Sequence, residues 1–404
     1  MNRSLIILLT ASVAIIIVNL HTAQTSIGLI GSALSMPDSL IGLIMMAPLA
    51  GYAMGLIFIV PLSDFVENRR LILCMLAAAM VSAGVASVSV NFIQLFGALF
   101  ILGSSCSCIQ VLVPMAASMA PPEQRGRAVG DIMAGLMLGV VAARPFASFA
   151  ADMFGWRFVY ALGSFAIGLI CLLLVLRLPI SHPFVTSSSY FTLIKSMWQL
   201  VRGEDTLRRR ATTAGLVMAS FSMFWSTVAL HLEACPTAFS QKEIAVFALV
   251  GAGGVLATPV AGRLGDRGFT RVGTISAHVM IFISMLIAAL AGYLYTFSAS
   301  VSVISLGLSA IALDVGLTTD HTLGRREINL IRPEARGRMN GLFVGLFFIG
   351  GSVGAALSGV TWSLGGWWLT CVSSSAFAAL ALLVDFAWHS QKSGLLAESH
   401  SEPV

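Results

Sequence analysis

Long apolar runs separated by short polar loops dominate the chain. Six runs of membrane-spanning length fall near residues 5–28, 38–62, 71–90, 94–119, 128–150 and 158–178, and six more near 212–232, 241–262, 272–294, 300–323, 340–361 and 367–388. About twenty apolar residues, rising 1.5 Å each, cross a hydrocarbon core about 30 Å thick, so each run can form a transmembrane helix. The pattern predicts an all-α polytopic membrane protein with twelve transmembrane helices in two six-helix bundles.

The amino-acid composition excludes a soluble globular protein. Hydrophobic residues make up 57% of the chain and charged residues 10%, whereas a soluble surface needs about a quarter charged residues. The outer surface is therefore expected to face lipid. The first run, behind Arg3, is interpreted as a retained first helix, because no small-residue cleavage pattern follows it.

Basic residues lie almost entirely on one side of the predicted topology. If both termini share a side, all of the 23 lysines and arginines lie there except Arg144, Arg157 and Lys242. The positive-inside rule makes that side cytoplasmic. This asymmetry explains the net charge of +5 without a nucleic-acid partner. Together with the short loops, it predicts a multi-pass protein of a bacterial inner membrane with both termini cytoplasmic.

The polar stretch between the two sets of runs predicts a domain boundary. We expect bundles at 1–178 and 212–388, a cytoplasmic linker at 179–211 and a disordered tail at 389–404. Within the linker, Phe191, Ile194, Trp198 and Val201 recur at helical spacing, which favours an amphipathic helix on the inner leaflet over a plain linker.

One stretch occurs twice. Pro122–Arg127 (PEQRGR) recurs 211 positions later as Pro333–Arg338 (PEARGR), and three further landmarks keep the same offset. They are Gly130 and Gly341, Gly139 and Gly350, and the pairs Gly155-Trp156 and Gly366-Trp367. One register held over about 45 residues indicates an internal duplication.

Two loops resemble a known family. Leu62-Ser63-Asp64 followed by Arg69-Arg70 is similar to the loop 2–3 signature of the major facilitator superfamily, and Gly262–Gly268 followed by Arg271 is its second-half counterpart. The resemblance covers the whole chain and is greatest to the twelve-helix drug/proton antiporter and sugar-efflux type branch. Two features depart from that branch: Leu99 stands where its coupling arginine falls, and Gly135-x-x-x-Gly139 is followed by Val140 instead of proline.

The resemblance implies a gate at the cytoplasmic side. Asp64 would face the start of the eleventh helix and Asp266, beside Arg271, the start of the fifth, since a helix N-terminus favours a carboxylate. Arg69 or Arg70 could then pair with an acid at the start of the fifth helix, either Glu123 or Asp131. The alternative is charge that only sets the topology.

Two charges lie inside predicted helices, where they are unfavourable and therefore candidates for function. Arg144 is expected either to face a wet central cavity or to lie at the outer interface near Asp152. Asp314 lies near the middle of the tenth helix, where it could carry a coupling proton, pair with Arg144, or do both. The duplication does not repeat the arginine, because Ala355 stands at the same offset.

Further polar groups complete a predicted pathway for substrate and protons. The resemblance implies that helices 1, 4, 7 and 10 line it, which selects Asn19, His21, Gln24, Gln110 and Trp225. Phe221, Ser226 and His231 are weaker candidates, and His278 is interpreted as incidental. For isolated histidines and tryptophans, packing is the alternative.

The motifs of enzymes, nucleotide binding and metal binding do not stand out, so no cofactor and no metal are expected. We expect a monomeric secondary transporter that moves a small organic solute by alternating access, with proton-coupled efflux as the leading mode. The alternatives are uptake of an organic anion by Arg144 and a non-transporting membrane sensor.

Overall fold

The computed structural model describes residues 3–24, 26–180, 189–235, 239–295, 298–332 and 335–399. Among these residues every regular element is a helix. The first bundle contains α1 (Arg3–His21), η1 (Thr22–Gln24), α2 (Ile27–Ala33), η2 (Asp38–Leu40), α3 (Leu43–Met54), η3 (Gly55–Ile59), η4 (Val60–Asp64), α4 (Asn68–Ser87), α5 (Phe92–Cys106), α6 (Ile109–Met119), η5 (Pro122–Gln124), α7 (Arg125–Phe154) and α8 (Trp156–Arg177).

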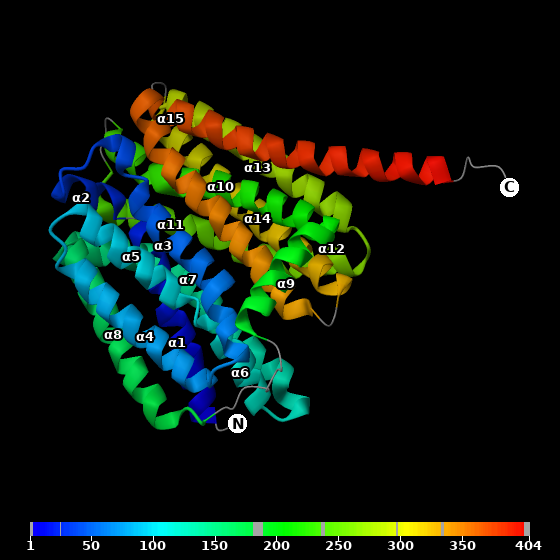
Figure 1. Cartoon of the computed structure of the whole chain (residues 1–404). Coiled ribbons are helices and arrows are strands. Elements are labelled where there is room, and N and C mark those ends of the chain that lie inside the picture. Colours follow the sequence, from blue (N-terminus) through cyan, green and yellow to red (C-terminus); the bar gives the residue numbers. More distant parts are fainter. Residues whose placement is uncertain are drawn as a thin grey trace.

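The linker helix α9 (Tyr190–Gly203) precedes the second bundle. That bundle contains α10 (Asp205–Ala234), α11 (Gln241–Val250), η6 (Gly251–Leu256), α12 (Ala257–Asp266), α13 (Thr270–Leu294), α14 (Ala299–Ile331) and α15 (Arg336–Ser399). Figure 1 shows the two bundles side by side.

The described residues form twelve crossings, although just ten continuous segments among them are long and apolar enough to span a membrane by themselves. Two features explain the difference. The segment Arg336–Trp388 contains two crossings, because the non-helical φ/ψ angles of Gly365 and Gly366 bend α15 there. The eighth crossing is divided into α11, η6 and α12. The predicted all-α fold with twelve transmembrane helices in two bundles is therefore confirmed.

The duplicated residues perform the same structural tasks in both bundles. A Cβ atom at Gly139 would lie 2.6 Å from the carbonyl oxygen of Ala14 on α1, and one at Gly350 would lie 2.0 Å from that of Gly215 on α10. Glycine thus lets the fifth and eleventh helices contact the first helix of their own bundle. Gly155 and Gly366 both have positive φ, 82° and 58°, a conformation that favours glycine.

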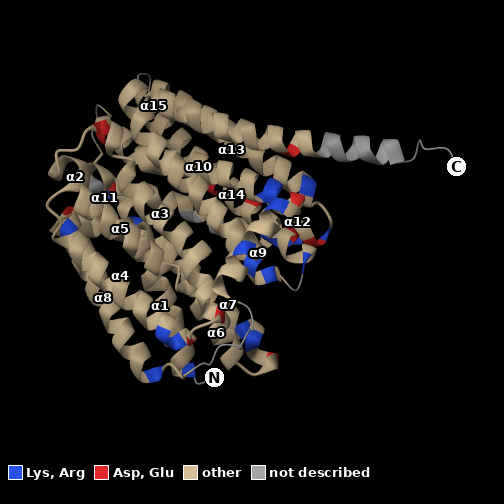
Figure 2. Cartoon of the chain, in the orientation of Figure 1, with Lys and Arg blue, Asp and Glu red and all other residues tan. Residues whose placement is uncertain are grey.

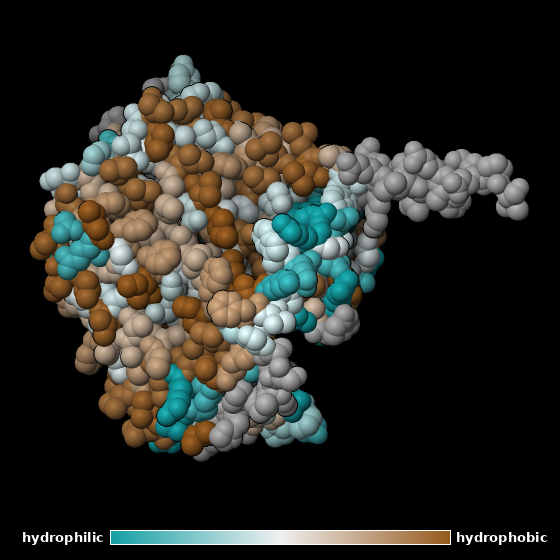
Figure 3. All heavy atoms as spheres, in the orientation of Figure 1, coloured by the Kyte–Doolittle hydropathy of each residue, from teal (hydrophilic) through white to brown (hydrophobic). Residues whose placement is uncertain are grey.

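Charged residues gather at the ends where α1, α7, α10, α13 and α15 begin, which we call the arginine-rich end (Figure 2). Much of the remaining surface is hydrophobic (Figure 3), and large apolar residues such as Phe165, Leu176 and Leu383 are 69%, 71% and 62% exposed. This is the distribution expected of helices surrounded by lipid.

The two bundles approach each other closely at the far end, opposite the arginine-rich end. A Cβ atom at Gly42, just before α3, would lie 2.0 Å from the carbonyl oxygen of Ala355 on α15, and one at Gly359 would lie 2.8 Å from that of Ser39. The arginine-rich ends of the bundles diverge in Figure 1. The conformation is therefore closed at the far end and splayed at the arginine-rich end.

Helix α9 links the bundles. Met197 and Leu200 are buried against protein, while Phe191 and Trp198 are 81% and 57% exposed. The Tyr190 hydroxyl donates to the Phe58 carbonyl of the first bundle at 2.7 Å, whereas Arg338 of the second bundle donates to Ser196 at 2.8 Å. A helix thus occupies the predicted segment, with one apolar face on the protein and two aromatic rings pointing outward, and its place on the inner leaflet stays a prediction.

The end of the chain differs from the prediction. Helix α15 continues to Ser399, whereas a disordered tail was expected from 389. Good helix formers, including Lys392 and Leu395–Glu398, extend a helix that is already nucleated within the bundle, which favours this continuation. Residues 400–404 lie outside the described residues, as does the middle of the linker, 181–188.

Candidate functional site

The two charges inside the helices meet between the bundles. Arg144 lies on α7 of the first bundle and Asp314 on α14 of the second, with Nη1 and Oδ2 3.8 Å apart. The residues are 6% and 5% exposed. Arg144 Nε also donates to Gln24 Oε1 on η1 at 2.8 Å. A buried charge needs a partner, and here the partner lies on the opposite bundle.

An aromatic wall from α10 contacts both members of this pair. The Trp225 indole N–H donates to Asp314 Oδ1 at 3.1 Å, while the Arg144 guanidinium carbon lies 3.9 Å from the centre of the Trp225 ring. The centre of the Phe221 ring is 5.3 Å from the same guanidinium carbon. Cation–π attraction holds Arg144, and a charge-assisted hydrogen bond holds Asp314. The pair therefore stays in place although its two members are too far apart for a hydrogen bond with each other.

Two glycines of η6 allow the backbone to press against the pair. A Cβ atom at Gly251 would lie 2.4 Å from Asp314 Oδ2 and 2.9 Å from Arg144 Nη1. One at Gly254 would lie 2.6 Å from Asp314 Cβ. Sequence reasoning missed these positions, although the run Gly251–Gly254 (GAGG) within an apolar segment was the available signal.

The predicted pathway residues separate into two groups. Gln24, Arg144, Trp225 and Asp314 come together at the pair. His21 is buried one turn from Gln24, in hydrogen-bonding distance of the Ile17 carbonyl at 3.2 Å.

Asn19 and Gln110 lie elsewhere. Asn19 points at α8, where its Oδ1 occupies the space that a Cβ of Gly163 would need, at 2.1 Å. The expectation that it lines the pathway is therefore wrong, because the rotation of α1 turns this position into its own bundle. Gln110 Nε2 donates to the Tyr52 hydroxyl at 3.4 Å, and Tyr52 contacts Phe348 of the second bundle with ring centres 4.6 Å apart.

Among the weaker candidates, His231 stacks on Trp367 with ring centres 4.4 Å apart. It serves packing at the far end and does not reach the pair. Ser226 donates to Met45 Sδ across the bundles at 2.9 Å.

A second buried ionic group lies in the arginine-rich half of the second bundle, and the sequence reasoning did not find it. His278 Nε2 lies 3.1 Å from Asp320 Oδ1, and its Nδ1 lies 3.3 Å from Asp385 Oδ2. Arg210 Nη1 is 3.5 Å from the same Asp320 oxygen. Arg209 contacts Asp385 at 3.7 Å. His278 is completely buried, so its interpretation as incidental is wrong.

Glu327 belongs to the same group and contacts both of its arginines. Its two carboxylate oxygens accept from Arg209 at 2.6 Å and face Arg210 at 3.3 Å. We call these six residues the ionic cluster: Arg209, Arg210, His278, Asp320, Glu327 and Asp385. They come from α10, α13, α14 and α15, so the cluster joins four helices of one bundle. The two consecutive arginines before the seventh run were the sequence signal, but a topology-setting role explained them equally well.

The predicted gate residues of the first bundle lie at the arginine-rich end. Asp64 is half-buried there and interacts electrostatically with Arg338 at the start of the eleventh helix. Arg69 Nη2 donates to the Val175 carbonyl of its own bundle at 2.7 Å. Arg70 Nε lies 4.0 Å from Glu67.

The remaining gate residues do not meet across the bundles in this splayed conformation. Asp266 faces Arg326 at 3.3 Å and not the start of α7. Glu123, Asp131 and Arg271 are exposed. A closed arginine-rich end is the state in which the predicted pairs would form, so the gate stays a prediction.

A family model for the Major Facilitator Superfamily matches residues 5–324. The chain belongs to this superfamily. The match covers the first bundle and continues into α14 of the second.

Relatives of this superfamily member carry transporter names. It is 33% identical to "Uncharacterized transporter YgaY" of Escherichia coli O157:H7 over 389 residues, which cover 95% of each chain. It is 27% identical to "Probable transporter SCO4007" of Streptomyces coelicolor, over 92% of this chain and 85% of that one.

Solved transporters share the fold of this superfamily member. A bacterial homologue of the human lysosomal transporter Spinster, in an inward-facing and unoccupied conformation, has a TM-score of 0.74 at 16% identity and 95% coverage of both chains. A POT family transporter in complex with a thioalcohol-conjugated peptide has a TM-score of 0.75 at 12% identity and 96% coverage of both. These structures show the fold, while the family match and the named relatives establish that the protein is a membrane transporter and not an enzyme.

Proposed function

We propose that the protein exports a small organic solute across the inner membrane in exchange for protons, by alternating access of its two bundles. The observation that carries this proposal is the buried Arg144–Asp314 pair, because its members belong to different bundles. A rocking motion changes the distance between two such groups, and a change in their charge biases the motion. The export direction rests on the similarity of the loops and the Gly135/Gly139 face to the efflux branch.

Asp314 is proposed to carry the proton. When it is ionised, it attracts Arg144 and accepts the indole hydrogen bond of Trp225. Protonation removes its charge and therefore the attraction between the bundles at this point. A solute that binds to ionised Asp314 competes with the proton, and such competition is what couples exchange.

Binding measured as a function of pH tests this coupling. Purified protein is screened against a panel of small organic cations, neutral solutes and anions, and a binder is titrated between pH 5.5 and 8.5. Exchange predicts that affinity rises with pH in the wild type and becomes independent of pH in Asp314→Asn. Affinity that falls as pH rises contradicts exchange.

Uptake of an organic anion is the second candidate, and the geometry at Arg144 favours it specifically. Its distance of 3.8 Å from Asp314 exceeds a hydrogen bond, so a carboxylate or phosphate group could replace Asp314 as the partner of the guanidinium. An anion would then bind together with a proton on Asp314. In the same titration this mode predicts tighter binding at low pH, and loss of anion binding in Arg144→Gln.

The further predictions that belong to this function are a cytoplasmic location of the arginine-rich end with both termini, the gate described above, and action as a monomer. Accessibility labelling of a single cysteine introduced at Gln124, which is exposed just before α7 at the arginine-rich end, reports the first of these. In intact cells, a membrane-impermeant thiol reagent should leave it unlabelled.

A further inference from the structure

A polar cavity of about 340 Å³ opens at the arginine-rich end of the second bundle. Its lining contains four arginines and two carboxylates. The arginines are Arg209, Arg210, Arg271 and Arg326, and the acids are Glu327 and Asp385. Arg209 and Arg210 form the buried floor and belong to the ionic cluster. An excess of positive charge in a concave site favours an anionic ligand.

The two arginines at the mouth of this cavity, Arg271 and Arg326, make few polar contacts with the protein. Arg271 is exposed and makes no ion pair or hydrogen bond with the part of the chain that the structure describes. Arg326 is 36% exposed at its side chain and contacts Asp266 through Nε alone, at 3.3 Å. At the floor, the Arg209 Nε atom is buried without a hydrogen-bond partner among the described residues. The mouth and the floor both have donors for an oxyanion.

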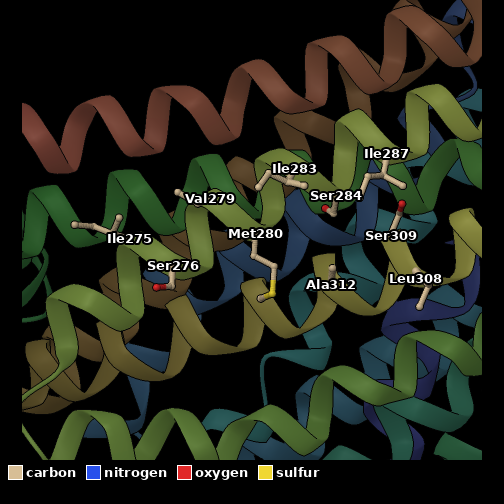
Figure 4. Close-up of a pocket in the computed structure, with 10 residues that line it drawn as sticks. All are labelled: Ile275, Ser276, Val279, Met280, Ile283, Ser284, Ile287, Leu308, Ser309 and Ala312. Carbon is tan, nitrogen blue, oxygen red and sulfur yellow. The ribbon is translucent and has the colours of Figure 1, made fainter.

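An apolar groove of about 520 Å³ begins where the cavity ends. Ile275 lines both. From there the groove follows α13 and α14 away from the arginine-rich end, with Ile275 at one end and Ile287 at the other (Figure 4). Ile287 follows Ile275 by twelve positions, which corresponds to a length of about 18 Å along the helix, roughly the depth of one leaflet of a bilayer with a ~30 Å core.

The groove is shaped by small residues between larger ones. Ser284, Ser309 and Ala312 line it without filling it, and the hydroxyls of Ser284 and Ser309 donate to carbonyls of their own helices, at 2.7 and 2.8 Å. Their polarity is therefore satisfied internally and the groove stays apolar. The rims face outward, since Ile283 and Leu308 are 48% and 61% exposed.

We propose that the cavity and the groove together bind one phospholipid of the leaflet at the arginine-rich end, with an anionic headgroup. Its phosphate lies between Arg271 and Arg326, above Arg209, and an acyl chain follows the groove along α13 and α14. A ligand that occupies both sites is amphipathic, because the polar cavity and the lipid-facing groove are adjacent at Ile275, which lines both. The site lies within the second bundle and is separate from the Arg144–Asp314 pair.

Bound lipid would stabilise the bundle, since its headgroup adds a negative charge beside the arginines of the cluster. The test uses the full chain in a mild detergent, with lipid affinity measured by native mass spectrometry and by the shift of the melting temperature. Phosphatidylglycerol and phosphatidylcholine with identical acyl chains are compared. We expect phosphatidylglycerol to bind tighter in the wild type.

Matched variants locate the headgroup. Each arginine near the membrane surface contributes about a 5-fold change in affinity, since ~1 kcal/mol is typical of such a charge. Arg271→Gln, which breaks no ion pair, should reduce phosphatidylglycerol affinity about 5-fold, and Arg271→Gln/Arg326→Gln about 25-fold. Arg263→Gln/Arg267→Gln removes two exposed arginines of the same region outside the cavity lining and should leave the affinity within about 2-fold.

A second pair of variants locates the acyl chain. Ala312→Phe fills the groove and should remove the preference for phosphatidylglycerol, whereas Ile304→Phe on the lipid-facing side of the same helix should retain it. Equal losses in the two arginine doubles, no preference between the lipids in the wild type, or equal stabilisation by glycerol phosphate would each overturn the proposal.

Discussion

The Arg144–Asp314 pair and the ionic cluster are both buried, but they differ in what they connect. The pair joins one arginine of the first bundle to one aspartate of the second at 3.8 Å. The cluster joins six residues of four helices within the second bundle, with contacts down to 2.6 Å. Rocking of rigid bundles alters the first and leaves the second intact. We therefore assign the pair to coupling and the cluster to the rigidity of one moving body.

The duplication shows that the fold does not need the cluster. At the offset of 211 positions, Asp320 corresponds to Ile109 and Asp385 to Leu174, both buried in the first bundle at 1% and 0% exposure. Apolar residues thus fill in one bundle the places that ions occupy in the other. This agrees with the general finding that a buried ion pair can be replaced by apolar packing, although removing one partner alone is strongly destabilising.

The largest predicted effect is on stability at the cluster. Asp320→Asn removes the carboxylate that Arg210 and His278 share, and should lower the free energy of unfolding by about 3–5 kcal/mol, because it leaves Arg210 buried with less compensation. Thermal unfolding in detergent measures this, with exposed Asp152→Asn as the control. Asp314→Asn should be less destabilising than Asp320→Asn, since the bundles can separate and admit water to Arg144. If Asp314→Asn were more destabilising than Asp320→Asn, the distinction between a coupling pair and a rigidifying cluster would be wrong.

The next prediction concerns the close contact of η6 with the pair. Gly251→Ala places a methyl group 2.4 Å from Asp314 Oδ2 and should be destabilising by about 1–3 kcal/mol through overpacking. Gly253→Ala is a matched control, because its nearest neighbour is a methyl of Ile311 at 3.5 Å. Both melting temperatures are compared with the wild type. Equal changes would mean that Asp314 does not hold its position against η6.

The smallest prediction compares two indole hydrogen bonds. Trp225→Phe removes the donor to Asp314 at 3.1 Å, and Trp367→Phe removes a donor to the Ala288 carbonyl at 2.8 Å within the second bundle. Each should change stability by about 1–2 kcal/mol. Only Trp225→Phe should also alter the pH dependence of solute binding. An altered pH dependence in Trp367→Phe would show that this readout is not specific to the pair.

The sequence was sufficient for the fold but only partly for the site. A helix in lipid needs apolar residues, and a turn with positive φ, as at Gly155 and Gly366, favours glycine. Both requirements are local and depend little on distant contacts, so the sequence pattern shows them directly. The single charges Arg144 and Asp314 were also informative, because a membrane interior makes any charge exceptional. The inward rotation of Asn19 and the convergence on His278 depend on how helices turn against each other, and helical periodicity in uniformly apolar segments does not encode that rotation.

Spin labels at Gln124 and Arg267, one on the arginine-rich end of each bundle, test the role of the pair most directly, because they need no known solute. Both positions are exposed, and the distance between them in a cysteine-free background is measured by pulsed electron paramagnetic resonance from pH 5.5 to 8.5. Protonation of Asp314 should shift the distance distribution of the wild type as the pH falls. Asp314→Asn should show the low-pH distribution at every pH. A variant that still follows pH as the wild type does would contradict coupling through Arg144 and Asp314.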